Sequence, residues 1–99
     1  MGRIVVLGAG ESGVGAAVLA GAKGYDVFVS DSGTIAEKYK AMLFERGILF
    51  EEGHHTEAQI LNADEIVKSP GIPDTAPIVR AAVERGIPIL SEIELAGRY

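Results

Sequence analysis

The stretch Ile4-Val5-Val6-Leu7-Gly8-Ala9-Gly10-Glu11-Ser12-Gly13 decides the fold. Residues 4–7 form an aliphatic, β-branched run, which predicts a strand buried on both faces of a parallel sheet. The glycines that follow have the spacing G-x-G-x-x-G, and a helical pattern of apolar residues begins directly after them. A strand, a glycine loop and a helix in this order predict a turn that binds phosphate.

Each glycine of this loop has an expected role. We expect Gly8 to allow the tight turn, Gly10 to let the backbone approach a diphosphate, and Gly13 to let the helix pack against the strand. Free amides at the helix start, together with the helix dipole, favour an anion. Ser12 is expected to cap the helix or to donate its hydroxyl to a phosphate, while the Glu11 side chain points into solvent and leaves its amide free. A tight strand–helix turn without a ligand is the alternative.

Short apolar runs alternate with helical patterns along the rest of the chain. Strands are predicted at residues 4–7, 26–30, 48–50, 65–69 and 87–90, each followed by a helix. This alternation predicts one α/β domain over residues 1–99, a Rossmann-like doubly wound fold. Its five-stranded parallel sheet has the expected order 3-2-1-4-5, with helices on both faces.

Local signals set the expected helix ends and faces. Capping boxes are predicted at residues 34–37, 56–59 and 91–94, and helix stops at Gly24, Gly47 and Gly86. Helical spacing turns eight further residues toward the core, namely Ile35, Tyr39, Met42, Leu43, Ile78, Val79, Ala82 and Val83.

Two more loops lie where ligands bind in such a sheet, at the carboxyl ends of the strands. Asp31 ends the second strand, and an acid at this place in such folds accepts hydrogen bonds from a ribose or from a base edge. The alternative is that Asp31 only caps the following turn. Ser32 is expected to line the same crevice. Ser69-Pro70-Gly71-Ile72-Pro73 follows the fourth strand. The Ser69 hydroxyl and the Gly71 amide are expected to contact the second side of a diphosphate or a sugar. A rigid strand–helix connection that binds no ligand is the alternative.

Composition excludes several classes of function. The 99 residues include no cysteine, so disulfides and thiolate zinc sites are excluded, which fits a reducing cytoplasm. A net charge of −5 argues against nucleic-acid binding. The longest uncharged run, residues 12–22, is too short to cross a membrane. His54 and His55, near Glu51 and Glu52, are expected in a solvated loop, so we predict no metal site.

The chain also shows no catalytic apparatus. The P-loop pattern G-x-x-x-x-G-K-[ST], a thiol nucleophile and a Ser/His/Asp arrangement are absent, so we predict a binding unit without catalytic residues. The last predicted helix has a start signal and no stop signal before Tyr99. We therefore expect a piece of a longer protein, with a frayed C-terminus as the alternative.

Four segments together resemble the N-terminal domain of the Mur ligases, in particular the branch that adds D-glutamate. They are residues 8–15 (GAGESGVG), 31–32 (DS), 69–73 (SPGIP) and 91–95 (SEIEL). The resemblance implies a domain that binds the UDP part of UDP-N-acetylmuramoyl-L-alanine in the cytoplasm. It further implies that ATP, Mg²⁺ and D-glutamate bind to other domains of a full ligase for peptidoglycan precursors. There, ATP forms an acyl phosphate on the substrate and the amine of D-glutamate attacks it. The resemblance also implies that this domain alone holds no cofactor and is inactive.

The resemblance also assigns a substrate site. Its expected members are Gly10, Glu11, Ser12, Gly13, Asp31, Ser32, Ser69, Pro70 and Gly71. Gly33 stands where some relatives carry an arginine, so a side-chain contact from that position to the uridine is lost. An NAD(P)-binding domain of a dehydrogenase or a potassium-channel regulator, and a non-enzymatic sensor, remain as alternatives.

Overall fold

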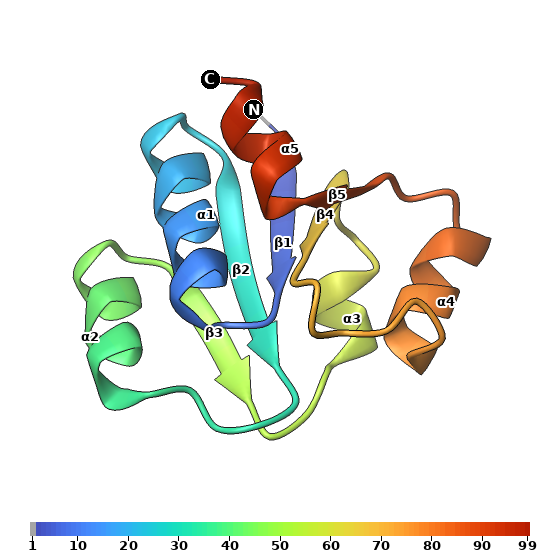
Figure 1. Ribbon diagram of the computed structural model, residues 1–99, viewed down its shortest axis with the longest axis horizontal. Helices are drawn as coiled ribbons and strands as arrows, with labels where there is room; N and C mark the ends of the chain where they lie inside the picture. The colour runs from blue at the N-terminus through green and yellow to red at the C-terminus, as the bar shows by residue number, and fades with distance from the viewer. Residues whose placement is uncertain (1) are drawn as a thin grey trace.

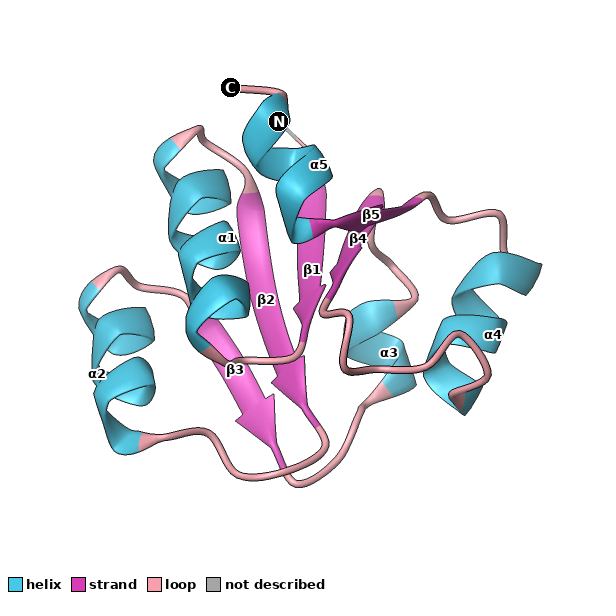
Figure 2. Cartoon of the chain, in the orientation of Figure 1, coloured by secondary structure: helices cyan, strands magenta, loops and turns pink. Residues whose placement is uncertain are grey.

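The computed structural model describes residues 2–99 and contains one parallel sheet (Figures 1 and 2). Its strands are β1 (Arg3–Leu7), β2 (Asp26–Asp31), β3 (Leu49–Glu52), β4 (Glu65–Lys68) and β5 (Ile89–Ser91). The order β3-β2-β1-β4-β5 confirms the predicted topology. β1 and β4 are neighbours in space but not in sequence, so the loops that follow them meet at the point where the winding reverses.

Helices cover both faces of the sheet. They are α1 (Glu11–Ala22), α2 (Glu37–Glu45), α3 (Glu57–Ile60), α4 (Pro77–Glu84) and α5 (Glu92–Gly97). Residues of α1, α2 and α5 pack on one face, and residues of α3 and α4 on the other. Within residues 2–99, no helix is both long and apolar enough to span a membrane.

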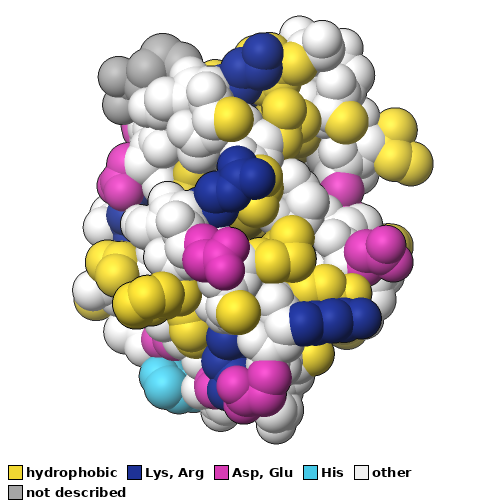
Figure 3. Space-filling model, turned by 90° about the vertical axis from the view of Figure 1, so that its left-hand side faces the viewer, with side chains coloured by type: hydrophobic (Ala, Val, Ile, Leu, Met, Phe, Trp, Pro, Cys, Tyr) yellow, Lys and Arg dark blue, Asp and Glu magenta, His cyan; other side chains and the backbone are white. Residues whose placement is uncertain are grey.

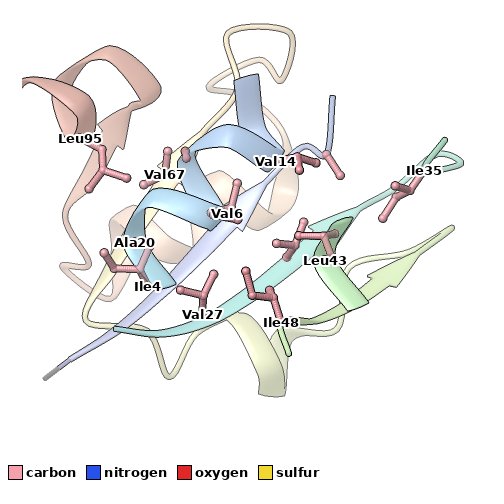
Figure 4. Packing of buried hydrophobic residues seen from close by; sticks show 14 residues of the cluster. Ile4, Val6, Val14, Ala20, Val27, Ile35, Leu43, Ile48, Val67 and Leu95 are labelled. Carbon is pink, nitrogen blue, oxygen red and sulfur yellow. The ribbon is translucent and has the colours of Figure 1, made fainter. Parts of the chain in front are cut away.

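The core consists of two apolar layers with β1 between them. Ile4 and Val6 pack with Val14, Leu43 and Leu95 of the three helices on one face (Figure 4). On the other face, the remaining β1 side chains pack against α3 and α4; the largest members of this second layer are Val5, Leu7, Phe28, Ile60, Ile66, Ile78 and Val79. Residues 4–7 have no exposed surface, so the central strand is held rigidly where the glycine loop begins.

Two of the three predicted capping boxes are wrong. α2 begins three residues after Thr34, with Ala36 as its cap residue and no side-chain cap, because the Ile35 amide donates to the Glu52 carboxylate (2.9 Å) and keeps the chain extended. Thr56 does precede α3, but its hydroxyl donates to Glu51 (2.6 Å). A carboxylate from β3 takes the hydrogen bond in both cases.

Predicted faces and boundaries also need correction. Met42 is 43% exposed and Val83 is 62% exposed, although helical spacing placed both in the core. Val83 lies about 100° around α4 from buried Ala82, at the margin of a narrow apolar stripe. Several predicted element ends differ from the observed ones by one to three residues. The left-handed glycines that follow α1, α2 and α4 confirm the predicted helix stops: Gly24, Gly47 and Gly86.

Candidate functional site

Packing requires two of the three loop glycines. Gly8 has a φ of +98°, and a β-carbon there would lie 2.7 Å from the β-carbon of Ser69. A β-carbon at Gly13 would overlap the Gly8 carbonyl oxygen. These contacts fix the loop against β4 and α1 against the loop. Gly10 has no atom within 4 Å of the corresponding position, so its side of the loop is open.

The first turn of α1 carries no side-chain cap. Gly10 is the cap residue and has an extended backbone, and the helix begins at Glu11. Ser12 therefore lies inside the first turn, and its predicted role as the helix cap is wrong. The amides of this turn have no partner four residues back, and they lie at the positive end of the helix dipole. They are available to an anion that approaches from the open side at Gly10.

Asp31 connects the loops that follow β1 and β2. Its Oδ2 accepts a hydrogen bond from the Ala9 amide (2.8 Å) and its Oδ1 accepts one from the Gly33 amide (2.8 Å). The turn cap is thus present, and the same carboxylate also holds the glycine loop. A carboxylate has about four acceptor positions, so two remain for a ligand. Ser32, beside it, is exposed.

The loop after β4 completes this edge of the sheet. The Ser69 amide donates to the Leu7 carbonyl (3.0 Å), so the β1–β4 ladder continues into both loops. Lys68 donates from Nζ to the Ile72 carbonyl (2.6 Å) and holds the loop from one side. Pro70 and Gly71 are exposed at its tip. Sequence reasoning did not select Lys68, whose position before the loop was the available signal.

The predicted residues meet at one edge of the sheet but line different hollows. Ser32 and Gly71 line a hollow of about 410 Å³. The other residues around it are His55, Glu57, Ile72, Pro73, Ala76, Pro77 and Ile78. Ser12 lines a separate hollow of about 440 Å³ between α1 and α5, and Pro70 lines a third of about 510 Å³.

The sequence did not predict a hydrogen-bond network that lies beside the hollow lined by Ser32 and Gly71. Glu51 accepts hydrogen bonds from the Ser30 hydroxyl (2.8 Å), and from the amide (2.8 Å) and hydroxyl of Thr56. Burial alone would raise the pKa of Glu51, but the hydrogen bonds from Thr56 and Ser30 outweigh it and hold the pKa below its usual value. The carboxylate is therefore ionised and acts only as an acceptor.

This network determines which ring nitrogen of His55 carries the proton. Nδ1 of His55 lies 2.7 Å from the Ser30 Oγ, whose proton is directed at Glu51. His55 must then donate from Nδ1, which leaves Nε2 of the neutral ring as an acceptor. Burial lowers the pKa of His55 below its usual value of 6.5 and favours this neutral ring.

The two histidines differ in their environments. His54 is exposed, as expected, and lies 3.1 Å from Glu51 Oε1, whereas His55 is partly buried. No group of three or more potential metal-ligating side chains occurs among residues 2–99.

The chain matches a family of known proteins and is similar to curated ligases. The family described as Mur ligase MurD-like, N-terminal domain matches residues 2–91. UDP-N-acetylmuramoylalanine–D-glutamate ligase of Bacteroides fragilis is 66% identical over 99 residues, which are 100% of this chain and 22% of the relative. The ligase of the same name from Porphyromonas gingivalis is 71% identical over 96 residues, 97% of this chain and 21% of the relative. The chain thus spans about a fifth of the length of these curated relatives.

Solved structures agree on the fold. A murein peptide ligase from Psychrobacter arcticus superposes with a TM-score of 0.88 at 22% identity, over 99% of this chain and 20% of that chain. A pseudomurein peptide ligase from Methanothermus fervidus has a TM-score of 0.81 at 28% identity, over 100% of this chain and 20% of that one.

Proposed function

The chain belongs to the family of MurD-like N-terminal domains of Mur ligases, and from this premise we propose that it binds the UDP part of UDP-N-acetylmuramoyl-L-alanine. In this proposal it is the nucleotide-binding domain of a ligase that adds D-glutamate to that substrate in the cytoplasm, during synthesis of peptidoglycan precursors. ATP, Mg²⁺ and D-glutamate bind to parts of the ligase outside residues 1–99. The domain alone is inactive, and it binds neither nucleic acid nor membrane.

The observation that carries the proposal is the uncapped start of α1. A diphosphate needs donors that no protein side chain already occupies, and the first turn of α1 offers such amides beside open space at Gly10. The proposed diphosphate contacts are the amides of Glu11, Ser12 and Gly13 and the hydroxyl of Ser12. Ser69 and Pro70 close the opposite side.

The nucleoside belongs, in this proposal, in the hollow lined by Ser32 and Gly71. Its volume of about 410 Å³ and its apolar wall suit a flat ring, and its polar wall contains Ser32 and His55. Asp31 lies next to Ser32 and keeps acceptor positions for a ribose hydroxyl. The acceptor at Nε2 of His55 matches the single N–H of a uracil ring.

Parallel titrations with UDP-N-acetylmuramoyl-L-alanine, UDP and NADH, followed by amide chemical shifts, test the proposal. We expect both uridine compounds to shift the amides of Ser12 and Gly71, with NADH leaving them in place. Shifts at these two amides with NADH alone would replace the proposal by a dinucleotide-binding function.

Two variants separate binding from folding. Ser12→Ala should weaken UDP binding without changing the free energy of unfolding, because the Ser12 hydroxyl caps nothing. Thr34→Ala is the matched control, since it removes a hydroxyl outside the proposed site. Equal UDP affinity in both variants would remove Ser12 from the site.

A further inference from the structure

A chain of hydrogen bonds runs from the interior of the sheet to the hollow that is lined by Ser32 and Gly71. Ser30 is the only buried polar or charged residue among residues 2–99, and its hydroxyl lies 2.8 Å from Oε2 of Glu51 and 2.7 Å from Nδ1 of His55. The two nitrogens of an imidazole ring point in different directions, so Nε2 of His55 faces away from Ser30. Because His55 also lines the hollow, this chain ends where a ligand can reach it.

The carboxylate of Glu51 is held firmly in this chain. Thr56 donates both its amide (2.8 Å) and its hydroxyl (2.6 Å) to Glu51, so the carboxylate has little freedom to turn away from Ser30. A buried hydroxyl in a strand needs partners, and an apolar side chain at that position would avoid this cost. The partners of Ser30 lie on the side of the hollow, which indicates a role there in addition to packing.

The fixed carboxylate sets the direction of every hydrogen bond in the chain. An ionised carboxylate only accepts, so Ser30 donates to Glu51, and the Ser30 oxygen accepts from the Nδ1–H of His55. The reverse direction would leave two acceptors, the Ser30 oxygen and Oε2 of Glu51, facing each other at 2.8 Å. The bond that one ring nitrogen makes determines the state of the other. Nε2 of the neutral ring therefore presents a lone pair.

Uracil and cytosine differ at the atom that such a lone pair would meet. N3 of uracil carries a hydrogen and donates, whereas N3 of cytosine accepts. The adjacent group is a carbonyl in uracil and an amino group in cytosine. The Ser32 hydroxyl both donates and accepts, so it suits either base, and Asp31 faces the ribose, which the two nucleosides share. The choice between the bases then depends on His55.

We propose that Ser30 and Glu51 are positioning residues that make His55 select uracil over cytosine, because they keep Nε2 of His55 an acceptor toward the base. This inference rests on the proposed function, since it needs a nucleotide base in the hollow, and it adds the feature that chooses the base. With cytosine, two acceptors face each other and neither gains a donor. This mismatch should weaken the binding of CDP relative to UDP by about 10- to 100-fold.

Protonation of His55 should reverse the match. An imidazolium donates from both nitrogens, so Nε2–H would then suit N3 of cytosine and oppose N3–H of uracil. Burial lowers the pKa of His55 below 6.5; the charges of Glu51 and Asp31 act in the opposite direction, and His54 adds to the lowering. α4 and the loop before it contribute only uncharged residues to the hollow, and Glu57 of α3 is exposed at its rim. The preference for uracil should therefore be complete above pH 6.5 and decline below it.

Affinities of UDP and CDP for the 99-residue chain, measured at about pH 8 and at about pH 5, test the base selection. The two nucleotides share their ribose and diphosphate, so the ratio of their affinities cancels the change in phosphate charge over this range. We expect UDP to bind more tightly at the higher pH, and the ratio to fall clearly at the lower pH.

Two matched variants locate the selection in one side chain. His55→Gln should remove the preference, because a carboxamide presents either its oxygen or its NH₂ group to the base. His54→Gln makes the same change at the neighbouring, exposed histidine, which does not line the hollow, and it should keep the preference. Histidine reaches the surface near the end of the face that carries α2, where acidic and basic side chains also lie (Figure 3). Loss of the preference in both variants would overturn the role of His55.

The tautomer of His55 can be measured without a nucleotide. ¹⁵N shifts of its ring should show the proton on Nδ1 in the unchanged chain at about pH 8. Ser30→Ala should give a mixture of the two neutral tautomers and a smaller ratio of UDP to CDP affinity, because it removes the partner of Nδ1. If Ser30→Ala does not fold, the ring shifts of the unchanged chain still decide where the proton lies.

The outcomes separate this inference from the proposed function. Equal affinities of UDP and CDP for the unchanged chain at about pH 8 would overturn the inference and leave the proposed function standing. A proton on Nε2 of His55 in the chain without nucleotide would also overturn the inference alone. If neither nucleotide bound, the proposed function itself would be contradicted, and the base selection would fail with it.

Discussion

Helices α1 and α5 begin close to each other, and their first turns are built in opposite ways. α1 follows Gly10, and no side chain caps it. α5 follows Ser91, whose hydroxyl accepts from the Glu94 amide (3.0 Å) while the Glu94 carboxylate accepts from the Ser91 amide (2.9 Å). One start satisfies its own donors, and the other leaves its donors free. In the proposed function, the free amides at the start of α1 are the donors that bind the diphosphate.

The loop that holds α1 in place is expected to be the most sensitive part of this comparison. Gly13→Ala should lower the free energy of unfolding by about 3 kcal/mol, because the new β-carbon meets a backbone oxygen that cannot move aside. Gly15→Ala, two residues later in the same helix, should raise it by about 0.5–1 kcal/mol, since its β-carbon enters open space. Urea denaturation of both variants checks this. Similar values for the two would mean that the Gly8–Gly13 approach is looser than described.

Asp31 is expected to have the next largest effect. Because α1 has no cap of its own, the loop before it depends on the two hydrogen bonds that Asp31 accepts from Ala9 and Gly33. Asp31→Ala should cost about 2 kcal/mol in unfolding free energy. Asp31→Asn should cost less, since its carbonyl oxygen still accepts one of the two bonds. Equal losses would show that the charge of Asp31, rather than its hydrogen bonds, holds the loop.

The helix starts also show which local features could be predicted from the sequence and which could not. The tight turn at Gly8, the close approach of Gly13 to it and the Ser91 capping box were predicted correctly, since each depends mainly on residues within a few positions of one another. The binding of a ligand by the glycine loop stays a prediction. The boxes at Thr34 and Thr56 have equally good local patterns and did not form. Glu52 and Glu51 of β3 take the donors instead, and a four-residue pattern does not reveal a competing carboxylate from a strand.

The candidate site shows the same limit. The positions of Gly8, Asp31 and Ser69 at one edge followed from the parallel topology, which was predictable from the alternation of strands and helices. The contact of His55 with buried Ser30 was not predictable, because it depends on Glu51 in the neighbouring strand orienting the Ser30 hydroxyl. The separation of the site residues into different hollows depends on side-chain volumes in three loops, which no spacing rule contains.

A smaller effect is expected from removing the serines at the two helix starts, Ser91 before α5 and Ser12 in the first turn of α1. Ser91→Ala should lower the free energy of unfolding by about 1 kcal/mol, the usual cost of losing a helix cap. Ser12→Ala should change it by less than about 0.5 kcal/mol, because the Ser12 hydroxyl makes no cap bond. Thermal and urea unfolding of the pair measure the difference. A loss for Ser12→Ala as large as that for Ser91→Ala would mean that α1 does have a side-chain cap.

The smallest expected effect is a difference between the starts of α1 and α5 in their response to acid. Hydrogen bonds from the Ser91 amide and hydroxyl hold the pKa of Glu94 below its usual 4.5. The unfolded chain therefore binds this proton more tightly, and the contribution of the capping box is fully present above pH 4.5 and is lost as the pH falls through the lower folded pKa. The Ser91 amide shift should follow that titration and report fraying of α5, while the Ser12 amide, which has no carboxylate cap, should not follow it. A Ser91 amide that titrates no lower than an unstructured glutamate would mean that the box is open in solution, and the two helix starts would then be equally exposed to a ligand.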